Sequence, residues 1–256
     1  MSLRSILSTF GSKPAPARPD TPSVYATSRC KLYGHPEFQI RVSNSAVPVE
    51  DISFLLQFFE QRVARGEKFR GGESLQVGWM FTMLEEGPAG FLRVLEPDMQ
   101  VVPVRFVDSV DNTLMQLRNQ KDVVESLSPS IAPDFPSLRQ SAVVHVNYQE
   151  ARRILLTRND PVNAADSGWW LSDLDDEARL EDPARFMKTS LYQLGVHRPD
   201  LIQFLAVPAG LQVAVDGARI SVLGPVQEVQ QIPGSYLSEL NKARQSAVSA
   251  GRSSAG

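Results

Sequence analysis

The sequence has little cysteine and no long apolar run. Its single cysteine, Cys30, cannot form a disulfide within the chain, and no motif around it marks a nucleophile, so we expect a small residue packed in the first folded segment. No stretch approaches the ~20 apolar residues that cross a bilayer, and residues 1–10 are too short and polar for a signal peptide. We therefore expect a chain that stays in the reducing cytoplasm and does not enter a membrane.

An excess of positive charge is also missing. The 256 residues carry a formal net charge of −3, whereas general nucleic-acid binding needs a basic surface, so direct nucleic-acid binding is not expected. The common enzymatic signatures G-x-S-x-G, G-x-x-x-x-G-K-[ST], H-E-x-x-H and C-x-x-C do not occur. His35, His145 and His197 are far apart in sequence and form no local metal-binding pair. We therefore expect no cofactor, and we expect His145, inside an apolar run, to be an ordinary strand histidine.

Composition divides the chain into modules. Residues 11–22 are rich in proline, glycine and small polar residues, and residues 128–137 hold three prolines and three serines, as linkers do. The predicted organisation is a flexible arm at 1–24, an N-terminal module at 25–127, a linker at 128–137, a C-terminal module at 138–250 and a disordered tail at 251–256.

The first module shows both helical and strand periodicity. Apolar residues alternate over 38–42, which predicts a strand, and Pro48 precedes an apolar face at helical spacing that should end at Gly66. Strand-like runs follow at 75–84, 90–95 and 101–107, then a helix at 113–127.

The second module mixes the same elements. We predict a buried strand at 141–146, a short helix or strand at 150–156, a loop at 159–168, helices at 182–194, from 199 and at 235–250, and a hairpin at 211–223 around Asp216-Gly217. The fold class predicted is α/β (α+β), with two small mixed modules, each a sheet packed by helices.

The most distinctive segment is DSGWWLSDLDDEARLED, residues 166–182. It holds seven acids against one base, a local charge of −6, so the negative charge of the chain is concentrated there. A solvated acidic loop is one interpretation, and a metal site is a weaker one because the frame of a calcium loop is missing. The third is a surface that attracts a basic protein partner.

Two tryptophans adjoin the acids and favour the third interpretation, because tryptophan is common at binding hot spots. We expect one of Trp169 and Trp170 in the core, and not both. The predicted partner-binding residues are Asp166, Ser167, Trp169, Trp170, Asp173, Asp175, Asp176, Glu177 and Glu181.

A family resemblance rests on an ordered set of segments. DSGW at 166–169, the acidic stretch, HRPDLIQFL at 197–205 and Pro208-Ala209-Gly210 resemble the immunity-protein domain numbered thirty-three in the polymorphic-toxin classification. The family's Asp-Pro-Asp has Arg198 in place of its first aspartate, and its usual glycine before the acidic pair is absent. Upstream, GESLQVGWMF at 72–81 and TLMQLRNQKDVVES at 113–126 resemble a companion module fused to this domain.

The resemblance implies an antitoxin without catalytic activity. Such proteins resemble those encoded beside effectors of type VI and other contact-dependent secretion systems in bacterial competition, where they bind and silence a toxin in the cytoplasm of the producing cell. The implied partner is a cognate toxin, and the acidic segment suggests a nuclease with a basic face. The alternatives are an adaptor or scaffold of a secretion system and an enzyme that uses clustered carboxylates.

Overall fold

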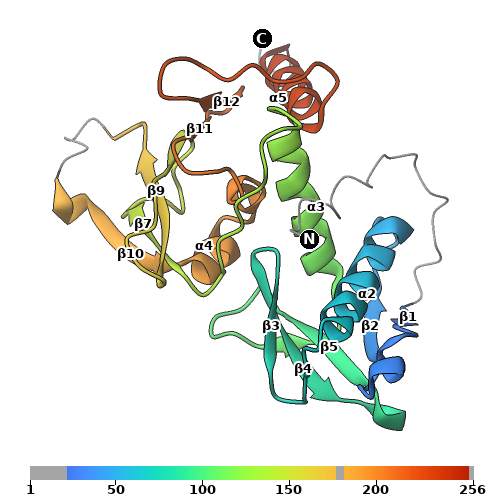
Figure 1. Cartoon of the computed structure of the whole chain (residues 1–256). Coiled ribbons are helices and arrows are strands. Elements are labelled where there is room, and N and C mark those ends of the chain that lie inside the picture. The colour runs from blue at the N-terminus through green and yellow to red at the C-terminus, as the bar shows by residue number, and fades with distance from the viewer. Residues whose placement is uncertain (1–21, 177–181, 254–256) are drawn as a thin grey trace. The chain divides into compact units, whose positions relative to one another are not determined.

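The chain consists of two compact α/β units, each built on a six-stranded sheet. The computed structural model describes residues 22–176 and 182–253 (Figure 1). Unit 1 comprises residues 1–118 and unit 2 residues 119–256, and the division falls inside a helix, α3 (Asp111–Glu125). The predicted α/β fold class is confirmed. Residues 128–137 lie within unit 2, and the module boundaries expected from composition stay a prediction.

The sheet of unit 1 has the strand order β1-β2-β5-β4-β3, with β6 paired to β5. Only β2 and β5 run parallel; the other pairs are antiparallel. Its strands are β1 (Ser23–Ala26), β2 (Phe38–Val42), β3 (Ser74–Val77), β4 (Met80–Glu86), β5 (Leu92–Pro97) and β6 (Phe106–Val107). Short 3-10 turns lie at Cys30–Tyr33 and Pro88–Gly90.

Helix α2 (Val49–Ala64) supplies much of the core of unit 1. It begins after Pro48, carries Glu50 and Asp51 in its first turn, and ends before Gly66, whose φ of +93° suits glycine. Phe59 is fully buried and stacks on Phe38 of β2, with 4.5 Å between ring centroids. The helix predicted from Pro48 to Gly66 is therefore confirmed, as is the strand at 38–42.

Two strand predictions in unit 1 are wrong in detail. The run 75–84 is a hairpin, because Gly78 at φ +60° turns the chain between β3 and β4. The run 101–107 shrinks to the two residues of β6, and β1 had no counterpart in the sequence analysis. These strands are short, so tertiary pairing determines their bounds more than local pattern does.

The sheet of unit 2 has the order β10-β7-β9-β8-β11-β12. Only β7 and β9 are parallel; the other pairs are antiparallel. Its strands are β7 (Ser141–His145), β8 (Ile154–Arg158), β9 (Asp166–Asp173), β10 (Phe186–Ser190), β11 (Gln212–Val215) and β12 (Ile220–Leu223). The hairpin predicted around Asp216-Gly217 is confirmed as β11–β12.

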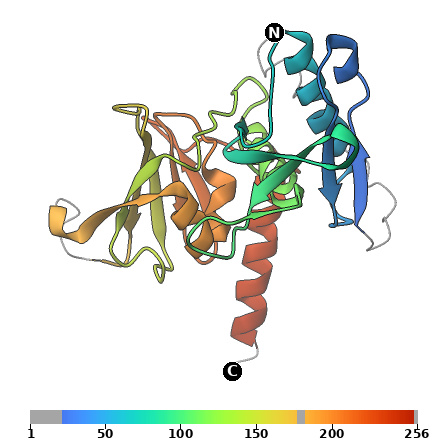
Figure 2. The ribbon, with the colours of Figure 1, turned by 90° about the horizontal axis from the view of Figure 1, so that it is seen from below.

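Helical segments accompany this sheet. They are the second half of α3, α4 (Leu191–His197), a 3-10 helix at Pro199–Phe204 and the C-terminal helix α5 (Tyr236–Ser253), which is red in Figure 2. The helix predicted over 182–194 is wrong: Asp182 caps only a 3-10 turn, Pro183–Arg185, and the chain then forms β10. Helix α5 ends at Ser253, inside the segment expected as a tail.

Burial separates the two faces of the second sheet. Ile154, Leu156 and Trp169 are at most 1 % exposed, whereas Leu155, Thr157 and Trp170 on the opposite face are partly exposed. In the part of the chain that the structure describes, no helix is long and apolar enough to cross a membrane.

Candidate functional site

The DSGW sequence forms an irregular start to the central strand β9. Ser141 of β7 pairs with Asp166, but Val143 pairs with Trp170, so β9 advances four residues while β7 advances two. The two extra residues of β9 interrupt the ladder locally, and because their number is even, the side chains that follow keep the same alternation between the two faces. The prediction of a loop over 159–168 followed by an acidic loop to residue 182 is therefore wrong for 166–173, which form a strand between two neighbours.

Asp166 holds the turn before the strand. One of its carboxylate oxygens accepts the Val162 N–H and the other the Gly168 N–H, each at 3.0 Å. The Val162 hydrogen bond, helped by that of Gly168, lowers the pKa of Asp166 against the opposing effect of burial. The Asp166 side chain is thus hydrogen-bonded to neighbouring backbone groups and stabilises the turn.

Gly168 explains why glycine occupies the third position of the motif. Its φ is +75°, and a Cβ there would lie 2.1 Å from the carbonyl oxygen of Asn159. The two residues are also joined by a hydrogen bond from Asn159 N–H to Gly168 C=O at 2.9 Å. No other residue fits this close backbone approach without a shift of the turn.

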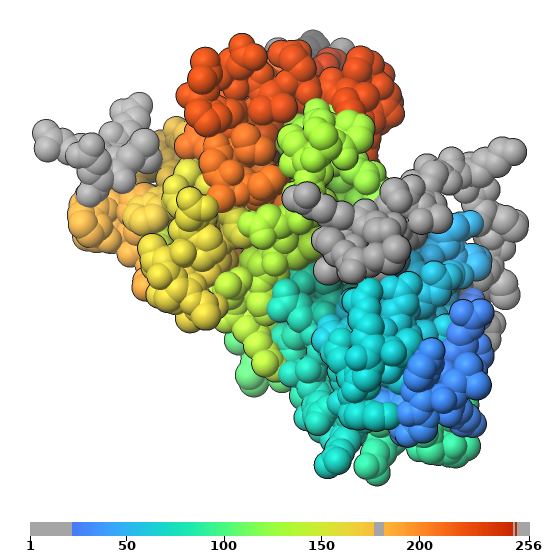
Figure 3. Space-filling view, viewed as in Figure 1, coloured from blue at the N-terminus to red at the C-terminus, as the bar shows by residue number. Residues whose placement is uncertain are grey.

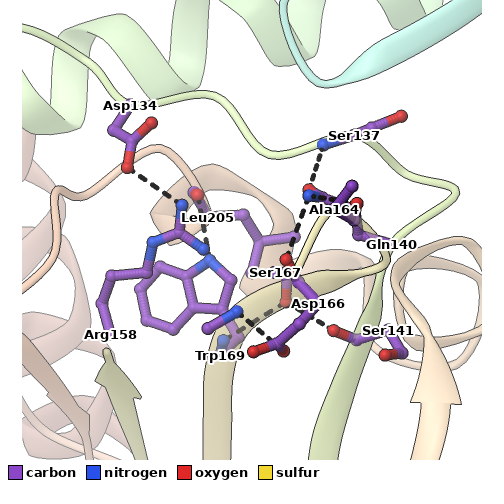
Figure 4. Close-up of polar contacts among 11 residues, drawn as sticks. Asp134, Ser137, Gln140, Ser141, Arg158, Ala164, Asp166, Ser167, Trp169 and Leu205 are labelled. Carbon is purple, nitrogen blue, oxygen red and sulfur yellow. Dashed lines mark hydrogen bonds and ion pairs between the residues drawn. The ribbon is translucent and has the colours of Figure 1, made fainter. Parts of the chain in front are cut away.

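Ser167 and Gln140 tie the bulge to β7. The Ser167 hydroxyl donates to Ser141 C=O at 2.8 Å and accepts the Trp169 N–H at 3.2 Å (Figure 4). The Gln140 amide donates to the carbonyl oxygens of Ala164 and Asp166 at 3.1 and 3.0 Å. Sequence reasoning missed Gln140, since a lone glutamine before a strand carries no signal of its role.

The two tryptophans lie on opposite faces of the sheet, and of the two only Trp169 lies in the core, so the prediction that one of them and not both would be buried is confirmed. Trp169 is 1 % exposed, and its indole N–H donates to Leu205 C=O at 3.1 Å. The guanidinium of Arg158 lies 5.3 Å from the Trp169 ring and 3.0 Å from Asp134 (Figure 4). Trp170 is 37 % exposed and lies against Phe186 of β10, with 4.7 Å between ring centroids. Of these two side chains, only Trp170 is therefore accessible to solvent.

The acids after the motif are mostly engaged within the chain. Asp173 is buried and accepts the Asp175 N–H at 2.9 Å. Asp175 is exposed and lies 3.1 Å from Arg153. Asp176 pairs with Arg185. Two further predicted residues, Glu177 and Glu181, lie outside the described residues. Trp170 and Asp175 are therefore exposed and Asp176 is partly exposed, whereas Ser167, Trp169 and Asp173 are buried.

His145 is buried at the end of β7, as expected of a strand histidine. Its Nδ1 accepts the Asn147 N–H at 3.2 Å, which leaves the ring proton on Nε2. Nε2 lies 2.7 Å from Asp176, although the contact lacks the angle of a hydrogen bond. The Phe186 ring meets the imidazole edge-on at 5.6 Å. This arrangement joins β7, β10 and the turn after β9.

The HRPD segment has a structural role. Arg198 donates to the carbonyl oxygens of Tyr148 and Ala151 at 2.7 and 3.0 Å, and its other nitrogens pair with Asp200. The Tyr148 hydroxyl lies 2.6 Å from His197 Nδ1. Arg198 therefore holds the turn that follows β7.

Two observations concern possible reactive or metal-binding side chains in the described ranges. Cys30 is buried, as predicted, and burial raises the pKa of its thiol to about 11, far from that of a reactive thiolate. Within residues 22–176 and 182–253, no three histidine, cysteine or acidic side chains are grouped so as to hold a metal ion.

Comparison with known families gives a match in the C-terminal half of the chain. Residues 119–223 match the model of one family, the Imm33-like domain. The C-terminal half of the chain therefore contains an Imm33-like domain, which includes the DSGW strand and the β11–β12 hairpin. No curated protein and no solved structure matches the chain. The N-terminal companion module stays a prediction.

Proposed function

We propose that this chain is an immunity protein that binds one cognate secreted toxin and neutralises it by stoichiometric contact in the cytoplasm of the producing bacterium. The observation that carries the proposal is the Imm33-like domain at residues 119–223. The role needs no catalytic group and no cofactor, because inhibition follows from binding alone. A nuclease delivered by a type VI or similar secretion system is the toxin we propose.

Within the predicted interface, the exposed side chains are proposed to make the contacts. Trp170 offers a large, partly exposed ring, and Asp175 offers a carboxylate whose ion pair with Arg153 is open to solvent, with both side chains about half exposed. A solvent-exposed ion pair is weak and is easily exchanged for a basic group of a partner. Asp166, Ser167 and Trp169 are proposed to act indirectly, through the shape of the bulge.

Co-expression tests the function. The protein encoded beside this chain's gene is produced in cells that it kills, with and without this chain. We expect rescue of growth and co-purification of the two proteins in a one-to-one complex. A neighbour that stays lethal and does not co-purify would contradict the proposal for this pair.

A double variant tests the contacts. Trp170→Ala with Asp175→Lys should weaken the complex at least about tenfold, because an aromatic anchor is lost and a charge is reversed. Leu32→Ala is the matched control, since Leu32 is 78 % exposed in unit 1 and belongs to no predicted contact. Equal affinity of the double variant and the control would reject these two residues as contacts.

A further inference from the structure

The two edges of the second sheet are treated differently by the fold. On the β12 edge, Asn241 of α5 accepts the Ile220 N–H at 2.7 Å and donates to the Ile220 carbonyl oxygen at 2.8 Å. The Val222 carbonyl oxygen accepts the Val229 N–H at 2.8 Å. The chain therefore closes this edge with its own groups, which is the usual protection of an edge strand.

The β10 edge is open among the described residues. Val146 N–H donates to Arg185 C=O, and Leu191 N–H donates to Gln140 C=O, at 2.9 and 2.8 Å. With the antiparallel register of β10 on β7, these two bonds fix residues 187 and 189 as the ones that bond to β7.

It follows that the backbone groups of residues 186, 188 and 190 point away from β7. Phe186 N–H bonds to Pro183 C=O. The carbonyl oxygen of Phe186, the N–H and C=O of Lys188 and the N–H of Ser190 have no backbone partner within residues 22–176 and 182–253. Two donors and two acceptors thus alternate along the edge, which is the pattern that an added strand needs.

Side chains around this edge suit a bound segment. Met187 is 45 % exposed and Lys188 is exposed. Phe186 and Trp170 form a partly exposed aromatic pair on the face that also carries Lys188. Strands β9 and β10 reach the molecular surface in yellow and light orange in Figure 3. Backbone groups would supply affinity and the aromatic pair would supply a preference for apolar side chains.

Lys188 determines which occupant fits. In a twofold antiparallel pairing of two copies, the register that satisfies all four backbone groups sets Lys188 opposite its counterpart, with Cα atoms about 5.5 Å apart. Like charges directly opposite each other destabilise a strand pair, whereas a carboxylate opposite Lys188 stabilises it. A second copy is therefore disfavoured, and a foreign strand with an acidic residue at this position is favoured.

We infer that the β10 edge, Phe186–Ser190, binds an extended segment of the cognate toxin, which adds a strand to the second sheet with a carboxylate opposite Lys188 and an apolar side chain on Phe186 and Trp170. This inference rests on the proposed immunity function and names the surface that performs it. It differs from the contacts proposed above in that the backbone of β10 makes the main interaction.

Proline at position 188 tests the inference. Lys188→Pro removes an N–H that faces away from β7, so the ladder inside the sheet stays intact. The toxin encoded beside this chain's gene should bind this variant at least about tenfold more weakly, because the ring removes one inter-chain hydrogen bond and crowds the next. Lys188→Ala keeps the N–H and should lose less than about fivefold, as expected for one exposed charge pair.

Val24→Pro is the matched control. Val24 lies on the edge strand β1 of unit 1, is 50 % exposed, and by the register of β1 on β2 its N–H also points away from the sheet. It should bind the toxin as the wild type does. Thermal unfolding of each variant checks that the fold is kept, and amide hydrogen exchange of the wild type should slow at Lys188 and Ser190 when the toxin is added.

The outcomes separate this inference from the proposed function. If the wild type binds the toxin and Lys188→Pro binds equally well, the edge is not the site while the immunity role stands. If the wild type neither binds the toxin nor rescues growth, both the proposed function and this inference are rejected. Slow amide exchange at Lys188 in the isolated chain would mean that another segment of the chain or a second copy occupies the edge. Sedimentation would distinguish these two cases. Either result would overturn the toxin as the occupant.

Discussion

The carboxyl groups of Glu96 in unit 1 and Asp166 in unit 2 each accept hydrogen bonds from two backbone N–H groups, but they differ in burial. Glu96, on β5, accepts the backbone N–H groups of Asn112 and Thr113 at the start of α3, at 3.1 and 2.7 Å. Asp166 accepts two N–H groups of its own turn. Glu96 is fully buried and Asp166 only partly. Burial raises the pKa of Glu96, whereas hydrogen bonds lower that of Asp166.

The difference shows that the number of hydrogen bonds does not determine the charge state that a fold prefers. Around Glu96 the loss of solvation outweighs four hydrogen bonds, including those from the hydroxyls of Thr113 and Ser109. Around Asp166 solvent remains close, so two hydrogen bonds are enough to favour the carboxylate. The first site fixes a helix and the second a strand bulge, and both can be tested by substitution.

The largest effect is expected for Gly168→Ala. The added Cβ would meet the Asn159 carbonyl oxygen at 2.1 Å at a φ of +75°, so unit 2 should lose about 3 kcal/mol or more of unfolding free energy. Urea unfolding followed by circular dichroism measures it. Gly210→Ala is the control, because its φ of +86° is equally strained but its Cβ would meet no atom within 4 Å; a loss of about 1 kcal/mol is expected there. Equal losses would mean that the close approach is unimportant.

Glu96→Ala should have the next largest effect. It leaves the N–H groups of Asn112 and Thr113 and the Thr113 hydroxyl without their acceptor, and we expect a loss of about 2–3 kcal/mol in unit 1. Urea unfolding followed by circular dichroism measures the change. Glu85→Ala, an exposed carboxylate paired with Arg93, should cost less than about 1 kcal/mol.

Asp166→Ala should cost about 1–2 kcal/mol, because the freed N–H of the exposed Val162 can bond to water, whereas that of the buried Gly168 loses its acceptor. The same unfolding measurement applies. A loss as large as that for Glu96→Ala would show that Asp166 matters as much as the buried carboxylate and would remove the contrast between the two sites.

The smallest and most specific effect is the pH dependence. Because the folded pKa of Glu96 is raised above its ordinary 4.5, its contribution to stability is complete below pH 4.5 and is lost as the pH rises through the folded value. Because the folded pKa of Asp166 is lowered below 3.8, its contribution is complete above pH 3.8 and is lost as the pH falls. The difference in unfolding free energy between the wild type and Glu96→Gln should therefore change with pH in the direction opposite to the difference between the wild type and Asp166→Asn. If both differences change with pH in the same direction, the contrast between the two carboxyl groups is contradicted.

Local sequence patterns predicted the elements that have strong local signals. Helix α2, strand β2 and the β11–β12 hairpin follow from apolar periodicity and turn residues. Strand β9 could not be recognised, because Asp-Ser-Gly is typical of a turn and the strand is held by neighbours distant in sequence. Strand β10 was hidden by the helix-start signal of Asp182-Pro183, which ends after one 3-10 turn.

The candidate site was predicted only in part. Composition located the segment and its tryptophans. It could not show that the side chains of Asp166, Ser167 and Asp173 form hydrogen bonds within the chain. Partners such as Gln140 and Ser141 are determined by the pairing of β7 with β9. The β10 edge, which is open among the described residues, could not be predicted at all. A strand lies at an edge because no other strand pairs with its outer side. This depends on the strand order of the whole sheet, so the sequence of β10 alone does not indicate it.

The exposure of Trp170 also gives the protein an optical reporter of its own. The chain has three tryptophans, and Trp79 and Trp169 are each 1 % exposed. A soluble quencher such as acrylamide should therefore reach Trp170 far more readily than the other two. Loss of that quenching on mixing with a partner would report, without any label, that the face bearing Trp170 and Phe186 has been covered.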